Sequence, residues 1–508
     1  MSTSSRVIKN TGYLYIKMGI SIFISLYSTR LVLSSLGASD FGTYNVVGGA
    51  IAMLGFLNST LANATQRFMS YAEGEGQLEN KTKIFNVSVV LHVFIAMATV
   101  LLLLLAMPPL FNSVFNIDPE RVASAKIVFY CLIVSTVLTI INVPYDAVMN
   151  AHENMLYYSV IGIFESLLKL GVAFICVKTA RDKLVVYGIL MACIPLITLS
   201  IMKVYCHRHY EECVIAPRQN WDVGLVKKIA TFSGWNFLTA ISSLFTAQGI
   251  GVVLNHFYGS VLNAAQGIAQ QVNGYMSSFS SNMMKALNPV IVKNAGANNI
   301  ASMNRATLAG CKFSAMLTLL FAVPLSLEIR FVLDIWLKEV PEWAKLFCVM
   351  QLVQSIIVQM ASSAATAVYA QGDIKNYAIW KSIMNAMPVL LVWIAFSIGG
   401  SPIWLYIPMI VVWAVGGDIV IIQFAKRKCG LILKDYLMHV FAPLVITVIS
   451  MLICGSLSML LMSESFVRFV ITCLATTFGM FISAWFFAVT QDEKMLFLGF
   501  VRQLIKAK

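Results

Sequence analysis

Charged side chains are scarce in this chain: Asp, Glu, Lys and Arg together make up 12% of its 508 residues, while hydrophobic residues make up 59%. Soluble domains usually carry about 25% charged residues. The scarcity therefore excludes a soluble globular protein and indicates a chain that is surrounded by lipid. Because one membrane-spanning helix needs about 20 apolar residues, the chain has room for about twelve to fourteen of them.

Sequence signatures of enzymes and metal sites are missing as well. The chain has no glycine-rich phosphate loop, no pair of catalytic carboxylates and no Ser/His/Asp set in one region. Its ten cysteines are scattered singly, without a CxxC pair, which excludes a disulfide framework and a zinc ribbon. Cys206-His207-Arg208-His209 with Cys213 has metal-binding residue types, and we interpret it as part of a solvated loop. The sequence therefore predicts no enzyme, no cofactor and no metal.

Long apolar segments fill most of the chain. We expect an all-α integral membrane protein with about 14 transmembrane helices. The expected helices lie at about 11–35, 44–72, 84–108, 123–149, 156–177, 184–205, 229–257, 263–291, 306–335, 343–370, 377–398, 403–425, 437–462 and 467–489.

An internal repeat organises these segments. Residues 11–76 recur 222 positions later, so that Gly37 corresponds to Gly259, and a weaker match pairs Tyr157 with Tyr377. Glycines recur where a helix begins, turns and ends, because those positions favour residues without a Cβ. Related halves in an apolar chain are typical of transporters, in which the substrate site lies between the repeats.

The repeat also predicts the domain organisation. We expect two pseudo-symmetric six-helix bundles at 1–205 and 229–425, joined by a cytoplasmic linker at 206–228. The remaining segment, 426–508, should hold two additional transmembrane helices and an amphipathic tail that lies at the membrane surface.

Basic residues are distributed unevenly between the two sides of the expected membrane. One set of loops holds 19 Lys and Arg residues and the other set holds five, which places both termini in the cytoplasm. The same bias accounts for the net charge of +13, so no nucleic-acid partner is expected. The basic outer loop 178–183 departs from the rule without an explanation in the sequence.

Polar residues inside the apolar segments are the candidates for a substrate site. In segment 263–291 they recur at steps of three and four, on one helical face. They are Asn263, Gln266, Gln270, Asn273, Ser277, Ser281, Lys285 and Asn288. Lys17 and Arg67 occupy the matching segments of the first half, so the repeat predicts a wet central cavity. The alternatives are hydrogen bonding between helices for the amides, and snorkelling to the headgroups for Lys17 and Lys285.

Three carboxylates within or near the ends of the segments are candidates for binding a coupling ion: Asp146, Glu165 and Asp418. Asp146 precedes a loop, where a helix cap or a water-facing residue is the favoured reading. Overall, the expected cavity is cationic and rich in amides. This composition suits an anionic, hydroxyl-rich cargo, because Lys and Arg bind phosphate oxygens and amides pair with sugar hydroxyls.

The turn Leu36-Gly37-Ala38-Ser39-Asp40-Phe41-Gly42-Thr43-Tyr44 and the matching Ala370-Gln371-Gly372-Asp373 carry a resemblance to a known family. They resemble the O-antigen and capsule lipid-oligosaccharide flippases of the multidrug/oligosaccharidyl-lipid/polysaccharide exporter superfamily. The resemblance implies two bundles that open alternately to either side of the bacterial inner membrane. It also implies a cargo of undecaprenyl-pyrophosphate-linked oligosaccharide for O-antigen, capsule or exopolysaccharide synthesis, with membrane lipids, a polysaccharide polymerase and other assembly proteins as candidate partners.

The resemblance further implies which residues contact the cargo. In that family, basic residues of the first, second, seventh and eighth helices contact the pyrophosphate. Carried over by position, the candidates are Lys17, Arg30, Arg67 and Lys285, with Lys312 as a weaker one.

Two other functions remain as alternatives. An ion-coupled multidrug exporter of the same superfamily usually has an acidic residue in its first helix, and none lies between Thr11 and Ser35. A membrane polysaccharide polymerase or glycosyltransferase needs a sizeable loop domain for its catalytic residues, and the expected loops are too short to form one.

Overall fold

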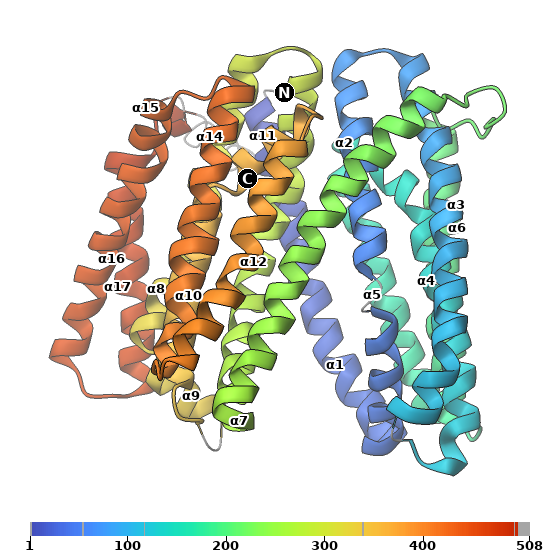
Figure 1. Ribbon diagram of the computed structural model, residues 1–508, viewed down its shortest axis with the longest axis horizontal. Coiled ribbons are helices and arrows are strands. Elements are labelled where there is room, and N and C mark those ends of the chain that lie inside the picture. Colours follow the sequence, from blue (N-terminus) through green and yellow to red (C-terminus); the bar gives the residue numbers. More distant parts are fainter. Residues whose placement is uncertain (1–2, 53–54, 116, 338–339, 492, 496–508) are drawn as a thin grey trace, which may run out of the picture. The chain divides into compact units, whose positions relative to one another are not determined.

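The computed structural model describes residues 3–52, 55–115, 117–337, 340–491 and 493–495, and this part of the chain is all-helical, without strands (Figure 1). Within it, twelve helices are long and apolar enough to cross a membrane, and a bent pair, Ser39–Ala52 with Leu57–Glu75, raises the count to thirteen. The expected helix at 263–291 is present but is not among these apolar spans. The all-α membrane fold is confirmed, and the count of about 14 is approximate.

Packing divides the chain into two compact units, and the first comprises Lys9–Phe237. Its helices are α1 (Thr3–Ala52), α2 (Gly55–Glu75), α3 (Leu78–Pro109), α4 (Val122–Ala151), α5 (Met155–Lys178), α6 (Lys183–His209) and the start of α7 (Val223–Gly296). Helix α4 packs against α2, α3 and α6 and lies at the centre of the unit. The fully buried Phe85 of α3 contacts the ring of Tyr145 of α4 with centroids 5.4 Å apart, in one of the unit's cores.

The second unit comprises Met1–Ile8 and Leu238–Lys508. After α7 its helices are α8 (Ile300–Leu327), α9 (Ile329–Trp336), α10 (Ala344–Met360), α11 (Ser362–Ala370), α12 (Lys375–Ser397), α13 (Tyr406–Pro408), α14 (Gly417–Cys429), α15 (Leu433–Tyr436), α16 (Ala442–Leu461) and α17 (Phe466–Ser483). Helices α16 and α17 form a hairpin that packs on α8. Most of the expected amphipathic tail, 496–508, lies outside the described residues.

Two glycines 222 residues apart bend the two longest helices. Gly37 in α1 has φ 78° and ψ 168°, and Gly259 in α7 has φ 76° and ψ −169°. An added Cβ would meet no atom within 4 Å at either position, so space does not require glycine there. The positive φ does, because side chains other than glycine rarely adopt this region. The backbone therefore repeats where the sequence repeats.

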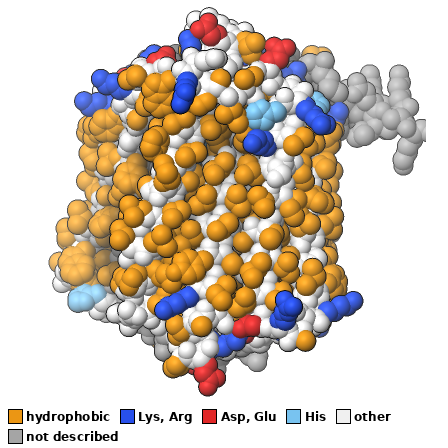
Figure 2. Space-filling model, turned by 90° about the vertical axis from the view of Figure 1, so that its right-hand side faces the viewer, with side chains coloured by type: hydrophobic (Ala, Val, Ile, Leu, Met, Phe, Trp, Pro, Cys, Tyr) orange, Lys and Arg blue, Asp and Glu red, His pale blue; other side chains and the backbone are white. Residues whose placement is uncertain are grey.

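The surface of the molecule suits a lipid environment. Figure 2 shows one face on which hydrophobic side chains form a broad belt, with charged side chains gathered above and below it. Large apolar residues such as Phe94, Leu101 and Leu105 of α3 are strongly exposed. In water such exposure would be unfavourable, whereas lipid chains solvate these side chains. The chain is therefore a multi-pass membrane protein.

Candidate functional site

The two legs of α7, which lie before and after the Gly259 bend, line an open pocket of about 310 Å³ within the second unit. Its lining residues recur at steps of three and four, which places them on one face of each leg. They are Ala247, Gln248, Gly251, Val252 and Asn255 before the bend, and Asn263, Gln266, Gly267 and Gln270 after it. A Cβ added to Gly251 would lie 3.5 Å from Asn263 Oδ1, so the legs approach each other closely. Five of the nine lining residues are amides and none is charged or aromatic.

Gln266 is held in place by a neighbouring helix. The hydroxyl of Tyr406 donates a hydrogen bond of 2.7 Å to Gln266 Oε1, and it also lies 3.4 Å from Gln351 Oε1. Both Gln266 and Tyr406 are almost fully buried. Because the carbonyl oxygen of Gln266 is engaged, its NH₂ group is the end that it can offer to the pocket. Tyr406 therefore orients one wall of the site.

Further along α7 the polar face contacts other helices instead of a cavity. Asn273 Oδ1 accepts hydrogen bonds from Ser355 of α10 and from Ser277, the latter at 3.4 Å. Asn288 Oδ1 accepts one of 3.0 Å from Thr366 of α11. The sequence predicts a single polar face, and in the structure this face has two different surroundings. Asn263, Gln266 and Gln270 line a pocket, whereas Asn273 joins helices, as the hydrogen-bonding alternative expects.

Two predicted cations of the first unit, Lys17 and Arg67, lie against aromatic rings. Lys17 Nζ is 4.3 Å from the ring centroid of Tyr158, and it packs so closely on Gly162 that a Cβ there would lie 2.6 Å from Nζ. The Arg67 guanidinium lies 4.6 Å from the ring of Phe68, 4.7 Å from that of Tyr71 and 5.7 Å from that of Phe232. Cation–π contacts of this kind stabilise a positive charge away from water.

The other predicted cations lie in different surroundings. Arg30 is exposed on α1, and Lys285 is half-buried on α7. Lys312 is 2% exposed, and its Nζ donates to both carboxylate oxygens of Glu493, at 2.9 and 2.6 Å, and to the Ala488 carbonyl at 2.8 Å. An ammonium has three donors. All three are occupied here, so Lys312 has none to offer a substrate in this structure.

The three predicted carboxylates also differ from one another. Asp146 accepts a hydrogen bond of 3.1 Å from Asn142, one turn away on α4. Glu165 forms an ion pair of 2.7 Å with Lys169, one turn along α5. Asp418 of α14 is half-buried within the apolar span Pro402–Cys429 and interacts electrostatically with a lysine of α12.

That lysine, Lys381, is a residue that the sequence analysis missed. Its Nζ lies 5.9 Å from the ring of Trp413, and a Cβ added to Gly417 would lie 2.4 Å from it, so it reaches the backbone next to Asp418. The sequence alone could have identified Lys381, because it is a charged residue inside an apolar segment, and such residues usually have a functional role. Gln248 and Asn255 were missed because only the second leg of α7 shows a continuous polar stripe.

The chain was compared with family models, with curated proteins and with solved structures. Residues 16–175, which cover most of α1 to α5, match the family model MatE. A search of curated proteins found no match. The structure is similar to a solved MATE structure in the bent conformation, with a TM-score of 0.74 and 14% identity, over 84% of this chain and 96% of that one.

Two further solved structures are similar to a comparable extent. One is an outward-facing multidrug resistance MATE family transporter of the MOP superfamily, with a TM-score of 0.69 and 15% identity over 84% of this chain and 96% of that one. The other is a MOP superfamily transporter from Pyrococcus furiosus, with a TM-score of 0.67 and 15% identity over 84% and 95%. The chain therefore matches the MatE model over residues 16–175 and shares its fold with these solved transporters.

Proposed function

We propose that this protein is a flippase that moves polyprenyl-pyrophosphate-linked oligosaccharide from the cytoplasmic to the outer leaflet of the bacterial inner membrane by alternating access. The observation that supports it most is the amide-lined pocket of α7. Amides both donate and accept hydrogen bonds, as sugar hydroxyls do. Gln266 and Gln270 are the residues we assign to sugar binding, and Lys17 and Arg67 stay the predicted contacts of the pyrophosphate.

The second candidate function is multidrug export, which the similarity to a multidrug resistance transporter favours. The pocket lining argues against it. Organic cations are recognised by carboxylates and aromatic faces, and the nine lining residues include neither. For the Pyrococcus furiosus transporter, a binding pocket of reverse polarity has been taken to suggest a different function. A shared fold therefore does not determine the cargo, which depends on the residues of the site.

For the coupling group we propose Asp418, because it lies in an apolar span and interacts electrostatically with Lys381 of another helix. A proton or a sodium ion that binds Asp418 would compete with the Lys381 ammonium. Such competition can link ion binding to the positions of α12 and α14. Asp146 accepts a hydrogen bond from Asn142 and Glu165 pairs with Lys169, in each case within one helix.

Transport by the purified protein in vesicles tests the proposed function. Proteoliposomes would be loaded with a fluorescent polyprenyl-pyrophosphate-linked oligosaccharide, and the fraction accessible in the opposite leaflet would be followed with imposed proton or sodium gradients. We expect faster exchange than in protein-free vesicles, and no uptake of a fluorescent organic cation. Uptake of the organic cation without movement of the lipid-linked sugar would replace the proposal by drug export.

A further inference from the structure

The connecting loop 210–222 joins α6 to α7 and exposes large apolar side chains. Together with the first residue of α7 they are Val214, Ile215, Trp221 and Val223, which are 54%, 47%, 44% and 70% exposed. Apolar side chains gathered on an exposed segment mark contact sites for proteins or membranes. The loop itself lies between two apolar spans, Lys183–His209 and Val223–Gly259, so the exposure of its side chains needs an explanation of its own.

One buried side chain fixes the backbone of this loop. Asn86 of α3 is 1% exposed, its Nδ2 donates a hydrogen bond of 2.8 Å to the Val214 carbonyl, and its Oδ1 accepts one of 2.8 Å from the N–H of Ala216. Figure 1 shows the loop at one end of the first unit, next to α3. The two bonds hold residues 214–216 against α3 while the side chains of Val214 and Ile215 stay exposed.

The position of Asn86 gives the depth of the loop in the membrane. The last Lys, Arg, Asp or Glu of α3 is Lys83, and its apolar run follows directly. Asn86 lies in the first turn of that run, so Val214 and Ile215 lie at the level where the apolar part of the membrane begins. Trp221 suits the same level, because tryptophan is enriched where membrane and water meet.

The exposed charges around these apolar residues are mostly positive. Arg218 is exposed and lies between Ile215 and Trp221 in the chain. Lys227 is exposed one turn after Val223, on the same face of α7. The acidic Asp222 is engaged at the start of α7, where its Oδ1 accepts a hydrogen bond of 3.0 Å from the N–H of Leu225. In the described segment 203–228 the exposed basic residues are Lys203, Arg208, Arg218, Lys227 and Lys228, and the exposed acidic residue is Glu211.

We propose that residues 214–227 form a docking surface for an anionic phospholipid of the bilayer. The acyl chains of this lipid lie against Val214, Ile215 and Trp221, and its phosphate is bound by Arg218 and Lys227. Apolar contact alone would suit any lipid, whereas the adjacent positive charge selects an anionic one. The surface belongs to the first unit alone and does not depend on which cargo the protein carries.

Quenching of Trp221 by brominated lipids in nanodiscs tests the docking surface. The chain has nine tryptophans, so the Trp221 signal is taken as the difference in fluorescence between the wild type and Trp221→Phe. Nanodiscs of phosphatidylcholine would contain the same small fraction of either phosphatidylglycerol or phosphatidylcholine, brominated near the glycerol end of the acyl chains. We expect brominated phosphatidylglycerol to be enriched at Trp221 about fivefold over brominated phosphatidylcholine, as one basic residue near the surface provides.

Two double variants, each paired with its own Trp221→Phe form, test the selection of charge. Arg218→Gln with Lys227→Gln should lose the preference for phosphatidylglycerol and keep quenching by phosphatidylcholine. Lys178→Gln with Arg181→Gln removes two exposed charges from another loop of the same unit and should keep the preference. All four substitutions are at exposed side chains, and size exclusion checks that the variants are folded.

Three results would overturn the proposal. Equal quenching of wild-type Trp221 by the two brominated lipids would show a surface without selection for charge. A preference that survives in Arg218→Gln with Lys227→Gln would assign the selection to other residues. Quenching by neither lipid would show that the surface lies away from the bilayer, where a protein partner or a second copy of the chain would cover it.

Discussion

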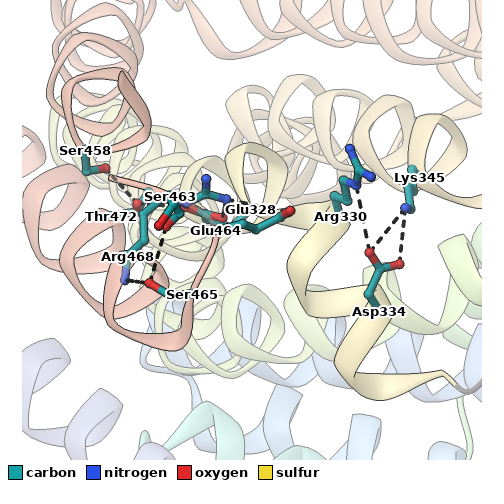
Figure 3. A network of polar contacts seen from close by, with 10 residues as sticks. All are labelled: Glu328, Arg330, Asp334, Lys345, Ser458, Ser463, Glu464, Ser465, Arg468 and Thr472. Atoms are coloured by element: carbon teal, nitrogen blue, oxygen red, sulfur yellow. Dashed lines mark hydrogen bonds and ion pairs between the residues drawn. The ribbon is translucent and has the colours of Figure 1, made fainter. Parts of the chain in front are cut away.

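Arg468 of α17 donates two hydrogen bonds to Glu328, from Nε to Oε1 at 2.9 Å and from Nη2 to Oε2 at 2.7 Å (Figure 3). The Glu328 side chain is fully buried at the junction of α8 and α9, and Thr472 donates a further bond of 3.0 Å to it. This bidentate pair fixes the α16–α17 hairpin to α8. Because the carboxylate is buried, removing its cation is costly.

The first prediction concerns this pair. Arg468→Ala leaves a buried carboxylate without its cation, which costs about 3–5 kcal/mol. We expect a clear drop of the thermal transition of the purified protein in detergent. Arg330→Ala is the matched control, because its side chain is 72% exposed and lies 3.9 Å from Asp334, as in Figure 3. Equal losses in the two variants would show that the buried pair has no special role.

The second prediction concerns Lys312 and Glu493, which join α8 to the segment after α17. In Lys312→Ala, Glu493 loses its cation and keeps the N–H of Thr490 as a donor, and the Ala488 carbonyl loses the Lys312 bond. The segment should then detach more often, so trypsin should cleave after Lys494 several times faster than in the wild type. Lys345→Ala removes a lysine with an exposed partner and should leave this rate unchanged. Unchanged cleavage in Lys312→Ala would contradict the anchoring role.

The third prediction concerns the two bends. Gly37→Ala and Gly259→Ala force a side chain into a backbone region that costs about 1–3 kcal/mol. Both variants should lower the thermal transition. Gly234→Ala is the control, because Gly234 lies within α7 and an added Cβ meets nothing within 4 Å, so alanine should be neutral or slightly stabilising. A loss in Gly234→Ala as large as in Gly259→Ala would point to helix propensity or lipid contact instead.

The fourth prediction concerns pH. The hydrogen bond from Lys428 lowers the pKa of Asp373, in the loop between α11 and α12. A lowered pKa in the folded state means that the pair stabilises the fold above the usual aspartate pKa of about 4 and that this contribution is lost as the pH falls further. The difference in thermal transition between wild type and Asp373→Asn should be larger at pH 7 than at pH 3. A difference that is the same at both pH values would refute this assignment.

Much of the fold could be predicted from the sequence, because lipid imposes long apolar helices and the repeat shows itself in glycines such as Gly37 and Gly259. The second leg of the pocket could be predicted too, since Asn263, Gln266 and Gln270 recur at helical spacing. The expected helix at 263–291 is not among the apolar spans, because these amides lower its hydrophobicity. The local sequence pattern therefore predicts both the helices and part of the candidate site.

Contacts between distant segments could not be predicted. Nothing near Lys312 in the sequence indicates that its partner is Glu493, because the two residues are 181 positions apart. His152 meets Glu73 and Glu212 only after α2, α4 and the connecting loop have packed together. The sequence shows that a charge is buried in an apolar helix, but its neutralising partner is decided by tertiary packing.

In the proposed mechanism, the amides of α7 bind the sugar part of a lipid-linked cargo. Its most direct test is the initial transport rate of polyprenyl-pyrophosphate-linked oligosaccharide in proteoliposomes that hold equal amounts of folded protein. We predict that Gln266→Ala with Gln270→Ala lowers this rate about tenfold or more, because sugar hydroxyls lose their partners. Gln271→Ala, which removes the neighbouring exposed amide outside the pocket, should keep the wild-type rate. Wild-type transport by the double variant would contradict the claim.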